Sequence, residues 1–150
     1  HDAGNLLADA LHDAECPVLV VPDQFEFPEK NILAYDGTEA SVYAIKQFAY
    51  LFPDLAKKET VLIYVHQGQE ITIPDETLIE ELCTRHFPNL TLFKLDINPN
   101  KHFALWCSER YGSLLISGAY GRSAASQMFK KSFVSEIIRE HRMPVFIAHL

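Results

Sequence analysis

The chain lacks the residue patterns that mark most metal sites and membrane spans. It has three cysteines, Cys16, Cys83 and Cys107, which form neither a Cys-x-x-Cys pair nor a cluster with histidines. We therefore expect no metal site, and we expect free thiols that are buried or half-buried in a reducing compartment. The sequence has no apolar run of about 20 residues and no secretory signal pattern, which predicts a cytoplasmic protein without a membrane span.

Positive charge and catalytic signatures are scarce as well. The 13 lysines and arginines are outnumbered by 20 aspartates and glutamates, and the formal net charge is -7. This balance argues against nucleic acid as a partner, because such a surface must neutralise phosphates. The Gly-x-Ser-x-Gly elbow, the Walker phosphate loop and the full Gly-x-Gly-x-x-Gly fingerprint are all missing. The sequence therefore gives no support for nucleophilic catalysis.

What is present is a regular alternation of strand and helix patterns from residue 31 onward. The 150 residues, 48% of them apolar, suffice for one domain with a buried core. Helical spacing predicts helices over 39–52 and 74–87, and further helices after Asn98 and after the loop at 118. Strands are predicted at 31–35, 60–65, 91–97, 113–117 and 145–150. This order predicts an α/β fold, a parallel sheet with helices on both faces.

Candidate binding residues follow three of these strands. Asp36 follows the first, Val65 ends the second and Gly118 follows the fourth. If the strand order is 3-2-1-4-5, Asp36 and the Gly118 loop face one crevice at the switch point. Asp36 could accept hydrogen bonds from a ribose or base, and Gly118 and Gly121 would allow close backbone approach to a phosphate. The alternative is structural: Asp36-Gly37 is an ordinary turn signal, and two glycines often only turn a strand into a helix.

The first 30 residues do not fit the alternation. A helix-like stretch and an apolar strand around Pro17-Val18 match the C-terminal helix and strand around Pro144-Val145, which indicates a tandem repeat. We expect residues 1–22 to be the last helix and strand of a preceding copy, 23–30 a linker and 31–150 the domain. The apolar strand at 17–21 should pair antiparallel with the edge at 145–149.

Together these segments resemble the universal stress protein family. The resemblance rests on ILAYDGTEAS, LIYV and SGAYGRSAASQMFKKSF, and it covers the C-terminal domain of a tandem protein with the tail of the preceding one. It implies an open five-stranded parallel sheet of order 3-2-1-4-5, the adenine nucleotide alpha-hydrolase-like fold, here with an extra N-terminal helix and strand. It also implies a stress-response module that forms homodimers, or an intramolecular pseudo-dimer, through the last strands.

ATP-binding members of that family carry Gly-x-x-Gly, nine residues and then Gly-Ser or Gly-Thr. Gly118 and Gly121 match, but Lys131-Ser132 stands where Gly-Ser is expected. A Cβ at Lys131 could keep phosphate oxygens off the backbone, or its ammonium group could compensate their charge. The family's nucleotide contacts would otherwise fall on Ala34, Asp36, Val65, Gly118, Gly121, Ser132 and Phe133.

Two hypotheses therefore stay open. The first is a module that binds an adenine nucleotide such as ATP, with Mg only as the companion of ATP and with slow hydrolysis at most. The second is a degenerate interaction or scaffold domain that binds no nucleotide, for which Lys131 is the supporting feature.

Overall fold

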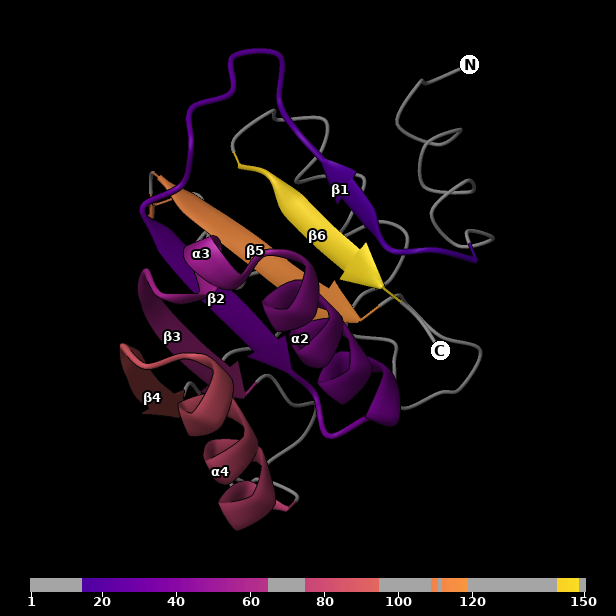
Figure 1. Cartoon of the computed structure of the whole chain (residues 1–150), viewed down its shortest axis with the longest axis vertical. Coiled ribbons are helices and arrows are strands. Elements are labelled where there is room, and N and C mark those ends of the chain that lie inside the picture. Colours follow the sequence, from indigo (N-terminus) through magenta and orange to yellow (C-terminus); the bar gives the residue numbers. More distant parts are fainter. Residues whose placement is uncertain (1–14, 65–74, 95–108, 111, 119–142, 149–150) are drawn as a thin grey trace.

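The computed structural model describes residues 15–64, 75–94, 109–110, 112–118 and 143–148 (Figure 1). The helices expected before residue 15, after Asn98 and after Gly118 fall outside these ranges. The described elements are β1 (Val18–Val20), β2 (Lys30–Tyr35), α2 (Glu39–Leu51), α3 (Pro53–Ala56), β3 (Glu59–Tyr64), α4 (Glu76–His86), β4 (Leu90–Lys94), β5 (Ser113–Gly118) and β6 (Val145–Ala148).

The strands form one sheet in the order β1-β6-β5-β2-β3-β4. Strand β2 lies between β3 and β5 and is parallel to both, and β4 and β6 continue the parallel ladder on either side. Counted along the chain from β2, the five parallel strands lie in the order 3-2-1-4-5. The sheet nevertheless has six strands and is mixed, rather than five-stranded and parallel, because β1 joins it antiparallel.

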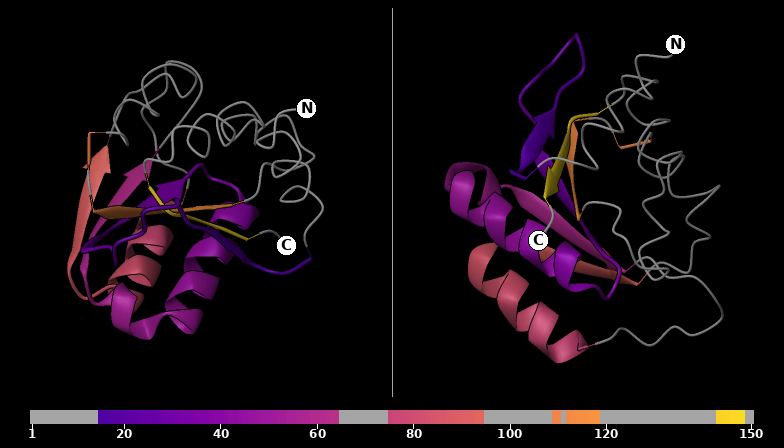
Figure 2. Two further views of the ribbon diagram at one scale, coloured as in Figure 1. Left: turned by 90° about the horizontal axis from the view of Figure 1, so that it is seen from above. Right: turned by 90° about the vertical axis from the view of Figure 1, so that its right-hand side faces the viewer.

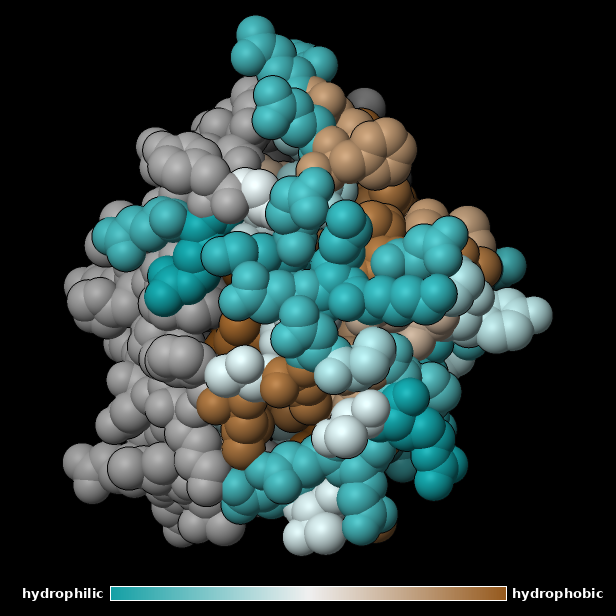
Figure 3. All heavy atoms as spheres, turned by 60° about the vertical axis from the view of Figure 1, so that its left-hand side comes forward, coloured by the Kyte–Doolittle hydropathy of each residue, from teal (hydrophilic) through white to brown (hydrophobic). Residues whose placement is uncertain are grey.

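Strand β1 pairs antiparallel with β6, as the apolar character of 17–21 predicted, and the pairing lies within one chain, a point that the sequence had left open. Val18 lies opposite Ile147, and Val20 lies opposite Val145. This pairing covers the edge of β6, whose four residues are all buried. Strand β1 itself is the outer strand of the sheet, and apolar residues in it and after it stay exposed: Leu19 (38%), Val21 (48%), Phe25 (37%) and Phe27 (77%). On the face shown in Figure 3, hydrophilic residues predominate among the described atoms, with smaller apolar areas between them.

The core lies where the helices pack on the central strands. All six residues of β5 are buried, as are the residues of β2 from Asn31 to Tyr35, which explains their nearly continuous apolar sequence. Phe48 of α2 is fully buried and contacts three other rings, those of Phe52, Phe87 and Phe146. Its centroid lies 6.3 Å from that of Phe87, at the end of α4, and 5.4 Å from that of Phe146 in β6. These aromatic contacts tie both helices to the sheet.

Helices α2 and α4 lie side by side on the same face of the sheet (Figure 2). Thr38 caps α2, since its side chain accepts a hydrogen bond from the Ser41 backbone N–H. The helices expected on the opposite face belong to parts of the chain outside the described ranges. No helix in the described part is long and apolar enough to span a membrane.

The first turn of α2 approaches the end of β5 very closely. A Cβ added at Gly118 would lie 2.8 Å from the Ala40 carbonyl carbon and 2.8 Å from the Ser41 nitrogen. Both are backbone atoms, so a side chain at this position would push the helix from the strand. Packing between helix and strand is therefore sufficient reason for glycine at 118, whether or not a ligand binds there.

Helix α4 presents a different face to the sheet than its sequence pattern indicated. Helical spacing would place Leu78, Leu82 and Cys83 on one apolar face of this helix, but the structure buries Ile79 and Cys83. Leu82 is half-buried, and Leu78 is 65% exposed. The buried pair is spaced four residues apart, which places both side chains in one row along the helix.

The described thiols also differ from the expectation that all would be at least half-buried. Cys83 is buried, and burial raises its pKa to about 12. Cys16 is exposed, because it precedes the outer strand of the sheet. Cys107 lies outside the described residues.

We predict that Gly118→Ala destabilises the fold by about 2 kcal/mol, because the added methyl group overpacks against backbone. Chemical denaturation monitored by circular dichroism measures this free energy. Gly112→Asn is the matched control, since nothing lies within 4 Å of a Cβ there, and asparagine tolerates its positive φ of 76°. A change of less than about 0.5 kcal/mol for Gly118→Ala would contradict the packing argument.

Burial of Cys83 predicts a loss of stability at alkaline pH. The folded state holds the thiol proton up to about pH 12, whereas the unfolded thiol ionises near its ordinary pKa of 9.0. The stabilisation that the shifted pKa of Cys83 gives the folded state is therefore fully present below pH 9.0 and is lost as the pH rises toward about 12. Over this interval the free energy of unfolding should fall by up to about 1.4 kcal/mol per pH unit more than in Cys83→Ala. Urea titrations of both proteins between pH 8 and 10.5 test this, and identical slopes would refute it.

Candidate functional site

The carboxyl ends of β2 and β5 meet at the centre of one sheet edge. From β2 the chain passes through α2 and α3 to β3 on one side, whereas β5 lies against the other side of β2. The strand order therefore reverses between β2 and β5. Because neighbouring parallel strands end at the same edge, Asp36, just after β2, and Gly118, the last residue of β5, share it. Ligands of open α/β sheets bind at such switch points.

Asp36 is held in place by the turn that starts α2. Its Oδ1 accepts a hydrogen bond from the Thr38 backbone N–H at 3.0 Å and another from the Thr38 hydroxyl group. Gly37 between them has a φ of 83°, a conformation that favours glycine. The turn reading of Asp36-Gly37 thus holds. The hydrogen bonds from Thr38 occupy Oδ1 of the carboxylate, and Oδ2 makes no hydrogen bond to another described residue.

Thr38 and Ser41 complete the junction between strand and helix. The Thr38 Oγ1 accepts a hydrogen bond from the Ser41 N–H at 3.2 Å, and the Ser41 hydroxyl group donates to the Thr38 carbonyl oxygen at 2.8 Å. Ser41 is fully buried and is one of the two residues that Gly118 approaches. The same few residues therefore fix the carboxylate, begin the helix and receive the end of β5.

The structure brings together two of the site residues predicted from sequence, Asp36 and Gly118. Ala34 lies two residues before Asp36, opposite Ile63 of β3, and is fully buried in the sheet. The other predicted contacts lie outside the described residues and stay predictions: Val65, Gly121, Lys131, Ser132 and Phe133.

Two tyrosines at this edge were missed in the sequence. Tyr35 and Tyr64 are the last residues of β2 and β3, lie opposite each other in the ladder, and have ring centroids 5.9 Å apart. Burial raises the pKa of Tyr35, and the charges of Asp75 and Asp36 and the neighbouring Tyr64 raise it further. The signal that could have found the pair is its position, since each tyrosine ends a strand just before a loop at the binding edge.

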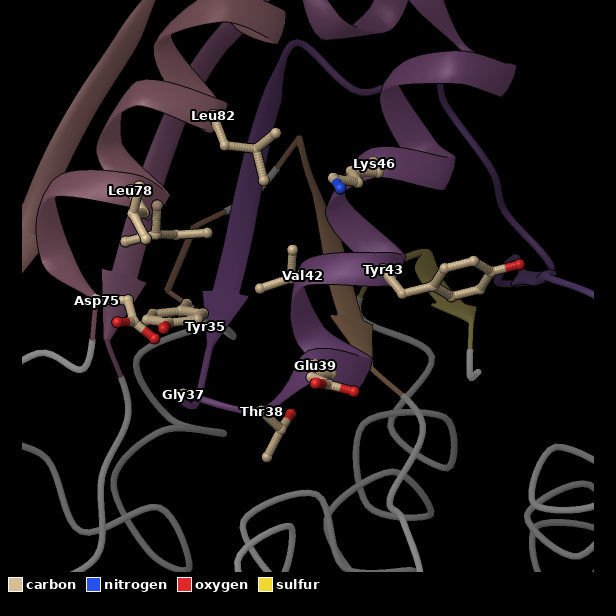
Figure 4. A pocket seen from close by; sticks show the side chains of 11 residues that line it. Tyr35, Gly37, Thr38, Glu39, Val42, Tyr43, Lys46, Asp75, Leu78 and Leu82 are labelled. Atoms are coloured by element: carbon tan, nitrogen blue, oxygen red, sulfur yellow. The ribbon is translucent and has the colours of Figure 1, made fainter.

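An open cavity of about 420 Å³ lies on the helical face of the sheet, between the N-terminal halves of α2 and α4 (Figure 4). The turn after β2 forms its lower border, and both helices supply its walls. Its lining residues are Tyr35, Gly37, Thr38, Glu39, Val42, Tyr43, Lys46, Asp75, Leu78, Ile79 and Leu82. Sequence reasoning did not indicate this cavity.

Within the described ranges, no group of three or more His, Cys, Asp or Glu side chains could hold a metal ion. What this part of the site offers is hydrogen bonding and shape: one carboxylate fixed at the switch point, a hydroxyl-capped helix start and a glycine at the end of β5.

Comparison with known proteins supports the fold assignment. No protein-family model matches the sequence, and no curated protein does. Among solved structures, a universal stress protein from Archaeoglobus fulgidus DSM 4304 superposes with a TM-score of 0.66 at 19% identity, over 95% of this chain and 52% of that one. A universal stress protein in complex with cAMP superposes with a TM-score of 0.57 at 14% identity, over 83% of this chain and 99% of that one.

The chain thus spans about half the length of the Archaeoglobus protein and nearly all of the cAMP-bound one. At these identities the likeness concerns the backbone arrangement. The α/β sheet described above has the fold of the universal stress proteins.

Proposed function

We propose that this chain is a member of the universal stress protein family and binds an adenine nucleotide at the edge shared by Asp36 and Gly118. The observation that carries this proposal is the fixed position of Asp36 at the switch point. The Thr38 N–H orients one carboxylate oxygen, which directs the other toward a ligand without further ordering cost. The cAMP complex of a structural neighbour supports the ligand class.

The described residues fit a nucleoside. A carboxylate oxygen without a hydrogen-bond partner among them suits a ribose hydroxyl group, and the first turn of α2, packed on Gly118, holds this carboxylate at the end of β5. The phosphates of ATP would then meet Lys131, Ser132 and Phe133, by the family pattern. The described part of the site supplies no cluster of ligands for a metal ion, so Mg would be held by the phosphates of ATP.

In this proposal the chain is a binding module and not an efficient enzyme. Nucleotide bound at the edge would contact the turn after β2 and the residues after β5 together, and so would favour the arrangement of the two segments that it binds best. Ligand binding would in this way be coupled to the surfaces that the two strands support. The stress-response role and the cytoplasmic location stay predictions.

A second proposed function, an interaction domain in a tandem protein, is favoured by the pairing of β1 with β6. In this reading, residues 1–22 end a preceding copy, 23–30 form the linker and 31–150 form the domain, which associates through its last strand. The Archaeoglobus match supports it, because residues 31–150 are only four fifths of the chain, whereas the match covers 95%. That match therefore includes part of the N-terminal segment.

We predict that Asp36→Asn weakens ATP binding about tenfold, the effect of losing one hydrogen bond to a charged group. Asparagine keeps an oxygen acceptor for Thr38 but replaces the other oxygen with an NH₂ donor. Isothermal titration calorimetry with ATP and with cAMP measures the affinities. Thr38→Ser is the matched control, because it keeps the hydroxyl group that bonds Asp36 and caps α2.

Lys131→Gly separates the two hypotheses in the same experiment. Wild-type binding that falls in Asp36→Asn supports the nucleotide module. Binding that appears only in Lys131→Gly would show that the natural site is degenerate, and equal affinities of wild type and Asp36→Asn would exclude Asp36 as a contact.

We also predict that removing residues 1–22 creates a dimer. The deletion uncovers the edge of β6, and a bare apolar edge strand pairs with another of its kind. Sedimentation velocity should show a larger assembly for residues 23–150 than for the full chain. Val21 lies just beyond β1, so Val21→Ser should leave the oligomeric state of the full chain unchanged. A deletion variant that stays folded without further association would count against pairing through the last strand.

A further inference from the structure

The cavity between α2 and α4 is a second site, separate from the proposed nucleotide site. The nucleotide proposal concerns the edge between β2 and β5, whereas the cavity lies between the two helices on one face of the sheet (Figure 4). The two share the turn at Gly37 and Thr38, and Tyr35 at the end of β2 borders both. Its volume of about 420 Å³ is of the size that small-molecule sites have.

The walls of the cavity are apolar and open to solvent. Val42 lies on the α2 side, and Leu78 and Leu82 project from α4 into the space between the helices (Figure 4). Leu78 is 65% exposed, although the next residue, Ile79, is buried. When a ligand covers a large apolar side chain beside a cavity, the burial of its apolar surface favours binding.

The charges of the cavity are separated along its length. Asp75 lies beside the Tyr35 ring at the end near the sheet edge, with Glu39 on the same level of α2, and Lys46 lies farther along α2 (Figure 4). The end near Tyr35 is therefore negative, and its two carboxylates are both exposed. The two carboxylates attract a cation to this end, against the smaller partial positive charge of the N-termini of α2 and α4.

The backbone at Asp75 supports a role in binding. Asp75 has a φ of 52°, the only positive φ among described residues other than glycine, and it precedes α4 without capping it through its side chain. Aspartate at such a position usually caps the helix. Here the left-handed backbone instead carries the carboxylate to the Tyr35 ring and the cavity. Strained conformations of this kind gather at binding sites.

We propose that this cavity binds a small amphipathic cation, an aromatic amine, whose ammonium group faces Asp75 and Glu39 and whose ring packs on Val42, Leu78 and Leu82. The Tyr35 ring, which is almost completely buried, borders the cavity at this end. Burial, followed by the charge of Asp75, raises the pKa of Tyr35. The inference does not depend on nucleotide binding at Asp36.

Tryptamine is the probe, and indole-3-propionate is its matched anion with the same ring and chain length. We expect tryptamine to shift the methyl NMR signals of Val42, Leu78 and Leu82 in the full chain, with at least fivefold higher affinity than indole-3-propionate. Asp75→Asn should weaken tryptamine binding about fivefold, the effect of one partly solvated charge. Asparagine tolerates the left-handed backbone, so this variant keeps the fold.

Two control variants define the site. Lys46→Gln should leave tryptamine binding unchanged or stronger, because it removes a positive charge from the cavity. Asp36→Asn should weaken tryptamine binding less than Asp75→Asn does, because Asp75 lines the cavity and Asp36 does not. No shift of the three leucine and valine signals, equal affinity for the anion, or unchanged affinity in Asp75→Asn would each overturn the proposal.

Discussion

The contact between the first turn of α2 and the end of β5 is the constraint on which the binding edge depends. At Gly118 the strand meets the Ala40 and Ser41 backbone with no room for a side chain. The turn that holds Asp36 begins the same helix, so the position of the carboxylate is fixed relative to β5 by backbone packing. The first glycine of the Gly-x-x-Gly pair thus has a structural task, and the geometry of the edge is set before any ligand arrives.

Much of this arrangement follows from local sequence. Continuous apolar runs predicted the central strands, because strands covered on both faces cannot alternate with polar residues. Parallel neighbours must end at one edge, which was enough to place Asp36 beside Gly118. The antiparallel pairing of β1 followed from its apolar residues and from its likeness to the last strand, and it changes the expected five-stranded sheet into a mixed one of six strands.

Other features depend on contacts that no local pattern encodes. Helix α4 begins after the left-handed Asp75, and its rotation about its own axis decides that Ile79 rather than Leu78 faces the core. The cavity depends on the spacing between two helices that pack on one face. The exposure of Cys16 follows from the outer position of β1 in the sheet. Each is a property of how elements meet, and each could be recognised only after their relative placement was known.

The pairing of the first described strand with the last has a mechanical consequence. Val18, nearer the N-terminus, lies opposite Ile147, nearer the C-terminus, so both ends of the chain leave the ladder at the same end. A pulling force between the two ends would load the outermost hydrogen bonds first and unzip the pair step by step, instead of shearing all bonds together. Such a force would therefore peel β1 away and expose the edge of β6 beside it, while the helix-covered centre of the sheet remained intact.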